Sequence, residues 1–307
     1  MVRKFRIVGA PYNHSALVTT KQNTVQALRE NDDDAWNGLS DWMDVRNGRW
    51  GADIQDLGDV ELSGDIQALL ERGEKVRALQ TYCMALENQL LDVYQSGSVP
   101  ITIGGDHSIA IATISAALKH YQVNRKEKVA VVWVDAHADC NDSIESNLHG
   151  KPLAMLMNRC EHQEWQHDPT VNLKPQDIYY VAIRDLMLNE ANLIAKNKIT
   201  CYDMAAIDEL GFRQVLTQLM ANLDADYDRI YVSFDYDCLD GSVFRACATP
   251  NVGGLSARET LMLVSKLSTS DKFIGIDFVE YLPELDPSRV SKELMVKLID
   301  AVWGYRV

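Results

Sequence analysis

The sequence predicts an α/β fold, a three-layer sandwich in which a mostly parallel β-sheet is flanked by helices on both faces. Two observations predict it. Short apolar runs, typical of strands buried on both faces, recur along the chain. These runs alternate with longer segments of helical composition, and that alternation is typical of parallel sheets covered by helices. No repeat, low-complexity tract or linker interrupts residues 1–307, so we expect a single domain.

Seven of the expected strands are runs of apolar residues rich in β-branched or aromatic side chains, and an eighth is expected as a short strand at a sheet edge. The run from 129 to 134 (VAVVWV) contains no polar side chain other than the tryptophan indole, so we expect it in the buried centre of the sheet. In chain order the expected strands cover residues 5–10, 54–57, 99–103, 129–135, 178–183, 199–202, 229–235 and 273–278.

The segments between these strands have mostly helical composition. In the first helical segment, leucines from Leu86 onward recur at helical spacing, which predicts a buried face, and Gly73 predicts a break. Residues 14–24 are expected as a loop, and residues 37–51, rich in polar residues and tryptophan, as surface loop. The expected helices cover residues 66–94, 108–121, 152–160, 188–197, 206–223, 256–268 and 287–303.

Composition narrows the class of partner and the compartment. The formal net charge of -14 and the pI of about 4.9 argue against nucleic acid as a partner, because phosphate binding needs a basic patch. No apolar run approaches the length of a membrane span, and the apolar part of residues 2–10 is too short for a signal peptide. The six cysteines form no C-x-x-C pair, so we expect free thiols and a cytoplasmic protein.

Polar residues follow three of the expected strands directly. Asp135, His137 and Asp139 come at the end of the run 129–134, each separated by one residue, so their side chains can point the same way. Asp235 and Asp237 repeat this spacing after another apolar run. The run 99–103 ends in Gly-Gly-Asp and a histidine. Because ligands bind at the carboxyl ends of strands in open α/β sheets, we expect these side chains to form one site.

This set of side chains predicts a metal site. Four carboxylates held close together in a partly dry cleft repel one another, and two divalent cations would balance their charge. Oxygen donors with some imidazole and no thiolate favour a harder ion such as Mn²⁺ over structural zinc. The candidate metal ligands are His107, Asp135, His137, Asp139, Asp235 and Asp237.

Four motifs together resemble the arginase–agmatinase family of ureohydrolases, and the match runs in register from Ile7 to the C-terminus. The motifs are GGDHSIA (104–110), DAHADCN (135–141), NLHGKP (147–152) and SFDYDCLD (233–240). The resemblance implies an arginase-like fold. It also implies a metal-dependent hydrolase of C–N bonds in linear amidines, with two Mn²⁺ per subunit and a homo-oligomer, a trimer or hexamer.

The resemblance also implies a role for each ligand. Asp135 and Asp235 would bridge the two Mn²⁺ ions, which share a hydroxide. Asp139 would hold that hydroxide and later pass a proton to the leaving amine. His149 in NLHGKP matches the family's proton-shuttle histidine, and Glu280 matches the carboxylate that grips the guanidinium. His107 and Asp139 would complete the ligand set of one ion, and His137 and Asp237 would complete that of the other.

The motif NLHGKP looks more like arginases than agmatinases or formimidoylglutamases, so the implied reaction is hydrolysis of L-arginine to L-ornithine and urea. Asn141 and Asp185 fall where arginases contact the α-carboxylate and α-amino groups of the substrate. Two features of the sequence do not fit arginine as the substrate. Residues 142–147 form a short acidic loop where arginases present hydroxyls, and Met187 stands where arginases place an aspartate.

These departures, and an atypical loop at 14–24, keep other readings open. One alternative is a hydrolase of another guanidino or formimino compound, such as agmatine, a guanidino acid or formiminoglutamate. Another is a non-catalytic scaffold that uses the arginase fold. The complete set of candidate ligands, together with His149 and Glu280, argues against the scaffold.

Overall fold

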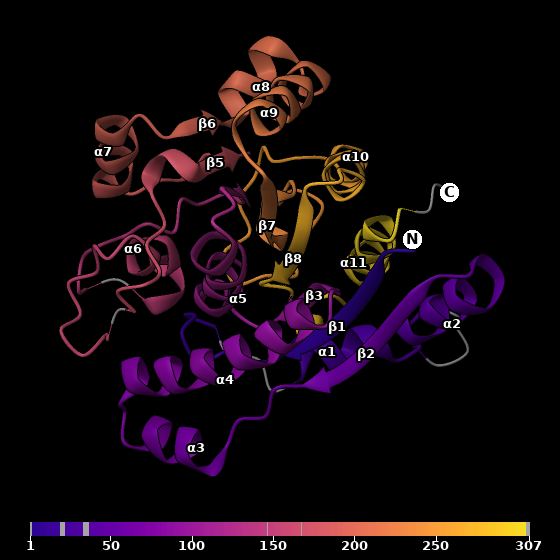
Figure 1. Ribbon diagram of the computed structural model, residues 1–307, viewed down its shortest axis with the longest axis horizontal. Helices are drawn as coiled ribbons and strands as arrows, with labels where there is room; N and C mark the ends of the chain where they lie inside the picture. The colour runs from indigo at the N-terminus through magenta and orange to yellow at the C-terminus, as the bar shows by residue number, and fades with distance from the viewer. Residues whose placement is uncertain (1, 19–21, 33–36, 146, 167, 305–307) are drawn as a thin grey trace.

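One parallel sheet forms the centre of the molecule (Figure 1). The computed structural model describes residues 2–18, 22–32, 37–145, 147–166 and 168–304. All neighbouring strands are parallel, in the order β2-β1-β3-β8-β7-β4-β5-β6. Each of the eight expected strands is present. The strands are β1 (Lys4–Ala10), β2 (Asp53–Asp59), β3 (Val99–Gly104), β4 (Val129–Val134), β5 (Ile178–Val181), β6 (Thr200–Tyr202), β7 (Arg229–Asp235) and β8 (Phe273–Val279).

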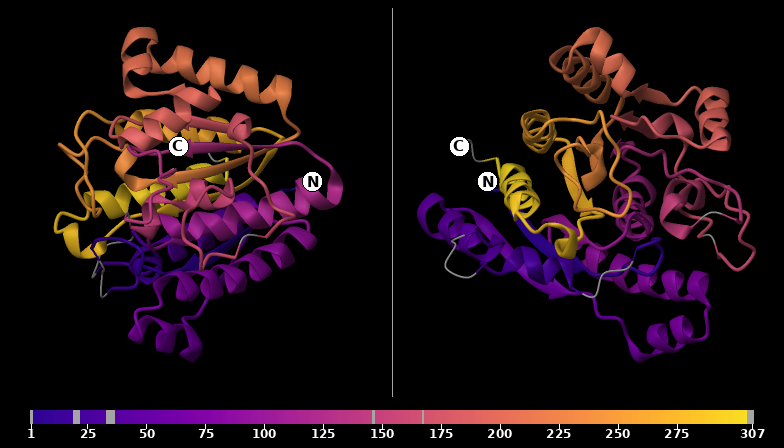
Figure 2. Two further views of the ribbon diagram at one scale, coloured as in Figure 1. Left: turned by 90° about the vertical axis from the view of Figure 1, so that its left-hand side faces the viewer. Right: turned by 180° about the vertical axis from the view of Figure 1, so that it is seen from behind.

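Both faces of the sheet are buried beneath helices. In β4, Val131 and Trp133 belong to one apolar cluster, whereas Val132 and Val134 belong to a second. Alternation along the strand therefore places one cluster on each face, and the predicted three-layer sandwich is confirmed (Figures 1 and 2).

The helices divide between the two clusters. Helices α3 to α7 contribute to the cluster with Trp133, and the other helices to the cluster with Val132. In chain order they are α1 (Thr24–Arg29), α2 (Leu39–Trp50), α3 (Gly64–Glu71), α4 (Lys75–Gln95), α5 (Ala110–Ala117), α6 (Pro152–Leu156), α7 (Leu188–Asn197), α8 (Met204–Leu210), α9 (Phe212–Asp226), α10 (Ala257–Ser268) and α11 (Val290–Val302).

The expectation of surface loop at residues 37–51 was wrong, because α2 occupies most of this segment. The helix buries few apolar side chains, so its sequence lacks an apolar stripe. Its buried anchor is instead Arg46, whose guanidinium forms a bidentate ion pair with Asp300 of α11 at 2.6 and 2.7 Å. The partner lies 254 residues away, so local sequence could not reveal it.

Replacing Arg46 with alanine should lower the free energy of unfolding by about 3–5 kcal/mol, because the Asp300 carboxylate would stay buried without its partner. Denaturant unfolding measures this change. Arg6→Ala is the control, since Arg6 pairs with the half-exposed Asp53 and should cost less than about 1 kcal/mol. Equal effects of the two variants would contradict the structural role given to the buried pair.

The carboxyl ends of the strands meet at one edge of the sheet, where the chain packs closely. The Gly105 N–H donates to the carbonyl of Ala10 at the end of β1, and the Gly105 carbonyl accepts from the Glu280 N–H after β8. A Cβ at position 105 would lie 2.0 Å from the carbonyl oxygen of Tyr12, so glycine is required at this close approach. These contacts fix the loops that follow β1, β3 and β8 against one another.

Candidate metal centre

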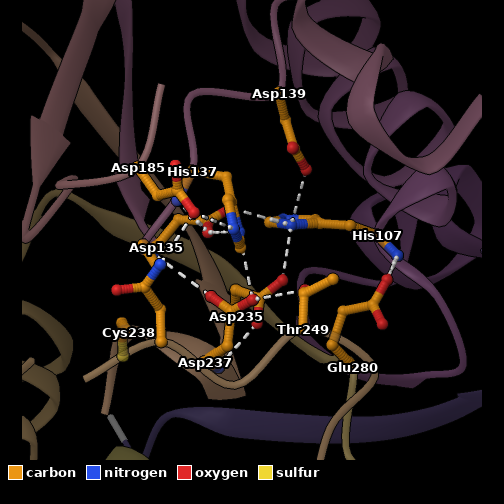
Figure 3. Close-up of polar contacts among 12 residues, drawn as sticks. His107, Asp135, His137, Asp139, Asp185, Asp235, Asp237, Cys238, Thr249 and Glu280 are labelled. Carbon is orange, nitrogen blue, oxygen red and sulfur yellow. Dashed lines mark hydrogen bonds and ion pairs between the residues drawn. The ribbon is translucent and has the colours of Figure 1, made fainter. Parts of the chain in front are cut away.

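The six predicted ligands come together beyond the carboxyl ends of β3, β4 and β7 (Figure 3). The first group surrounds the His107 ring. Its Nδ1 lies 3.0 Å from an oxygen of Asp235, 3.1 Å from one of Asp135 and 3.2 Å from one of Asp139. All four residues are buried. One imidazole nitrogen therefore faces three carboxylate oxygens within a single small volume.

A second group lies beside the first and shares Asp135 with it. The Nδ1 of His137 is 3.1 Å from Asp237 Oδ2 and 3.5 Å from Asp135 Oδ1, while Asp135 Oδ2 faces His107. Asp135 thus presents one oxygen to each group. Asp235 presents Oδ2 to His107, and its Oδ1 accepts a hydrogen bond from the Asp237 N–H at 2.7 Å.

Hydrogen bonding fixes which nitrogen of His107 can bind a metal ion. The Ser233 hydroxyl donates to Asp277 at 2.6 Å, so its oxygen is free only to accept from His107 Nε2 at 2.9 Å. Asp277 also accepts hydrogen bonds from two other hydroxyls, which supports its role as an acceptor. The lone pair of His107 Nδ1 therefore points at the carboxylates, and this buried atom has no hydrogen-bond partner among the described residues. A cation fits there.

The electrostatics of the cluster also call for cations. Burial and the neighbouring carboxylates of Asp237 and Asp135 raise the pKa of Asp235 well above its usual value. Burial and the charge of Asp135 raise the pKa of Asp237 to about 6. Burial lowers the pKa of His107, but the carboxylates of Asp135, Asp139 and Asp235 close to its ring outweigh burial and raise that pKa well above 6.5. Protons thus relieve the repulsion here, and divalent cations would relieve it more fully.

Two acidic side chains of the site sit on unusual backbone. Asp139 has a φ of 47° and Glu280 a φ of 66°, both in the left-handed region that residues other than glycine seldom adopt. Such backbone is maintained when surrounding contacts impose it. The Leu153 N–H holds the Asp139 carbonyl, and the Gly105 carbonyl holds the Glu280 N–H. Both carboxylates are thereby aimed at the site by the main chain.

His149 and Glu280, the predicted proton shuttle and guanidinium contact, form a pair beside the metal ligands. His149 Nδ1 lies 3.2 Å from Glu280 Oε1, and the same oxygen accepts a hydrogen bond from the main-chain N–H of His107 at 2.9 Å. Burial lowers the pKa of His149, but the hydrogen bond and charge of Glu280 outweigh it and raise that pKa to about 9. The histidine is therefore a cation at neutral pH, paired with a buried carboxylate.

A cavity of about 280 Å³ opens onto both candidate metal groups and onto His149 and Glu280. Asn141 and Asp185, the predicted substrate contacts, both line it. Asp185 is mostly exposed, accepts a hydrogen bond from Asn251 at 2.8 Å and lies 3.9 Å from His137. Two apolar side chains, Leu17 and Met187, also line the cavity. The atypical loops 14–24 and 142–147 border this region, although residues 19–21 and 146 lie outside the described part of the chain.

The acidic neighbour of His107 in the sequence, Asp106, does not orient the imidazole ring of His107 or of His137. Asp106 contacts neither ring; it accepts hydrogen bonds from the Ser15 N–H and from Ser108 instead. The residues that orient His107 are Ser233 and Asp277. A signal was present, because both are polar residues inside otherwise apolar strands, and such residues need a buried partner. Thr249, which donates to Asp237 at 3.1 Å and lines the cavity, carried no comparable signal.

Comparison with known proteins decides the family. A family model described as the arginase family matches residues 3–304. The chain belongs to the arginase family. An arginase of Bacillus caldovelox is 32% identical over 265 residues, which cover 83% of this chain and 86% of that arginase. This arginase-family chain is accordingly a hydrolase, consistent with metal-dependent cleavage of C–N bonds in linear amidines.

Solved structures of arginase-family proteins share the fold. The native structure of the Bacillus caldovelox arginase superposes with a TM-score of 0.82 at 27% identity, covering 100% of both chains. A formimidoylglutamase from Bacillus subtilis superposes with a TM-score of 0.76 at 19% identity, covering 99% of this chain and 87% of that one, which shows a shared fold alone. Within the described residues, no helix is long and apolar enough to cross a membrane.

Proposed function

We propose that this arginase-family chain hydrolyses the guanidino group of L-arginine to L-ornithine and urea, using two Mn²⁺ ions. One observation carries the proposal: a single cavity opens onto both candidate metal groups, His149 and the buried Glu280. A planar guanidinium fits a carboxylate of this kind, because it offers parallel N–H donors. The negative charge of the cavity lining favours a cationic substrate.

Six side chains would hold the metal ions. His107, Asp135, Asp139 and Asp235 would surround one ion, since three carboxylate oxygens face His107 Nδ1. Asp135 and Asp235 would bridge to the second ion, and His137 with Asp237 would complete it. When bound, the two cations lower the pKa of a water molecule so that hydroxide is available near neutral pH.

The other groups would position the substrate and move protons. Glu280 would bind the guanidinium and hold its carbon next to the metal ligands. Asp139, which lines the cavity, would accept a proton from the attacking water and deliver it to the amine as the C–N bond breaks. His149, held by Glu280, would exchange a proton with solvent, because its side chain is only partly buried.

A second substrate class is favoured by the outer part of the cavity. Met187 and Leu17 are exposed apolar residues that line it. Neither side chain carries a carboxylate that could pair with the α-ammonium group of an amino acid. The alternative is therefore another guanidino or formimino compound, such as agmatine, a guanidino acid or formiminoglutamate.

The reaction is tested by product release from the Mn²⁺-loaded protein. Urea release is compared for L-arginine, agmatine and 4-guanidinobutyrate, and formamide release is measured for formiminoglutamate. The proposal expects the largest kcat/KM with L-arginine. Turnover of another compound with arginine inert would establish the alternative, and no turnover with two bound metal ions would contradict both.

Metal removal should destabilise the protein. Restoring Mn²⁺ after chelation should raise the free energy of unfolding by about 2.7 kcal/mol per site when free Mn²⁺ is 100-fold above its Kd. At one fixed concentration of free Mn²⁺ the gain should be larger at pH 8 than at pH 6, because the ligands must lose protons to bind a metal ion and the Kd is therefore higher at pH 6. Thermal unfolding of chelated and Mn²⁺-loaded samples at both pH values measures this. Equal melting temperatures would contradict a built metal site.

We also infer that the chain works as a homo-oligomer, a trimer or hexamer, in the cytoplasm. Its family membership supports the assembly, and its six cysteines, all free, support a reducing compartment. Light scattering coupled to gel filtration tests the assembly. A mass near that of one 34.5 kDa chain would contradict it.

A further inference from the structure

Asn141 presents a fixed amide to the cavity. The side chain lines the cavity, and its Oδ1 accepts hydrogen bonds from the Ser143 N–H and from Asn189 Nδ2, both at 3.0 Å. A main-chain N–H can only donate, so the oxygen end of the Asn141 amide must face it. The Asn141 Nδ2 bonds no described residue. The amide therefore retains one free donor, its NH₂ group, on a side chain that borders the substrate cavity.

Asn189, the second residue of α7, also has a determined orientation. Its Nδ2 donates to Asn141 Oδ1 at 3.0 Å and to the Asp142 carboxylate at 2.9 Å. Both partners are acceptors, so only the NH₂ end of Asn189 satisfies them. Asn189 thus gives the second of the two hydrogen bonds that hold the Asn141 amide in this orientation, and it also binds the Asp142 carboxylate.

The surrounding main chain is anchored separately from Asn189. The Asn141 N–H donates to the Gly150 carbonyl at 3.1 Å. The ammonium of Lys151, which is fully buried, donates to the carbonyls of Asn141 and Ser143. The loop backbone therefore has other supports, and loss of Asn189 should change the amide more than the loop.

We propose that Asn189 is a specificity-determining positioning residue. Together with the Ser143 N–H, it holds the Asn141 amide so that the cavity offers a donor to a carboxylate at the far end of the substrate. The inference rests on the proposed function, in which the guanidino end lies at the metal centre. Apart from the metal ligands, His149 and Glu280, the charged side chains that line the cavity are the acidic Asp185 and Glu190. A substrate carboxylate in that part of the cavity therefore needs a neutral hydrogen-bond donor. A reversed amide would present an oxygen and repel it.

The test compares substrates that differ only in the carboxylate. Steady-state kinetics are measured with L-arginine and with agmatine, which lacks the α-carboxylate. Asn189→Ala should raise KM for arginine about fivefold, the effect of one lost hydrogen bond, with kcat within about twofold and agmatine unaffected. Asn189→Asp should raise it about 20-fold, because a carboxylate would face Asp142 and the Asn141 oxygen.

Asn197→Ala is the matched control, since Asn197 lies on the same helix, is also partly buried and donates to the Leu193 carbonyl away from the cavity. It should match the wild type on both substrates. Equal losses of the Asn189 variants on arginine and agmatine, a loss confined to kcat, or no loss would overturn the inference.

Binding separates this inference from the proposed function. If the wild type releases no urea from any guanidino compound, the proposed function fails. Calorimetric titration with L-ornithine and with 1,4-diaminobutane, which lacks the carboxylate, still tests Asn189. The expected result is an L-ornithine Kd about fivefold weaker in Asn189→Ala and an unchanged Kd for the diamine. Wild-type protein that binds L-ornithine no better than the diamine would overturn the inference.

Discussion

Replacing Asp235 with asparagine is expected to remove bound Mn²⁺ and urea release together. Asparagine keeps the shape of the side chain and can still accept the Asp237 N–H through Oδ1. It removes the negative charge of Oδ2, which lies 3.0 Å from His107 Nδ1 in the buried cluster. The loss of kcat/KM should exceed about 100-fold. That is the largest loss usually caused by mutating a residue that only hydrogen-bonds to a metal ligand.

Metal content after gel filtration and urea release measure the two effects. Asp177→Asn is the control, since Asp177 is also buried but contacts Tyr227 far from the cluster. The control should bind two Mn²⁺ per chain and turn over as the wild type does. An Asp235→Asn variant with two bound ions and full activity would show that Asp235 does not bridge a dinuclear centre.

His149→Asn should retain both metal ions and lose about 10²- to 10⁴-fold in kcat, the usual contribution of a positioned acid–base group. The pKa of about 9 sets the pH dependence: His149 is protonated at neutral pH and loses its proton above pH 9. We expect the protonated form to act, so wild-type kcat/KM should fall above pH 9 and the variant should lack this fall.

The pH–rate profiles of both proteins test the role of His149. His14→Asn is a suitable control, because His14 packs against Tyr12 in the loop that borders the site but does not line the cavity. It should leave the profile unchanged. A His149→Asn variant with the wild-type profile, or with its metal ions lost, would contradict a proton-transfer role.

The placement of the six candidate ligands could be predicted because it follows from parallel-sheet geometry. Carboxyl ends of parallel strands share one edge, so residues that directly follow apolar runs must approach one another. To place Asp135, His137 and Asp139, it is enough to locate the end of β4. The change from apolar to polar residues in the sequence marks that end closely. The fold class followed from the same alternation of strands and helices.

Residues whose role depends on a distant partner could not be predicted in this way. Helix α2 is held through Arg46 by a carboxylate on α11, and its own residues do not form an apolar stripe. Asn189 meets Asn141 only because the loops after β4 and β5 are adjacent at the sheet edge. Asp106 is next to His107 in the sequence, yet its carboxylate accepts a hydrogen bond from the Ser15 N–H in the loop after β1. Long-range packing decides such contacts.

The most direct test is a crystal structure of the Mn²⁺-loaded protein with anomalous diffraction measured at the manganese edge. We expect two anomalous peaks in each chain. One should lie among His107 Nδ1, Asp139 and Asp235, the other beside His137 and Asp237, with Asp135 reaching both. A single peak, or none, at saturating Mn²⁺ would contradict the dinuclear centre.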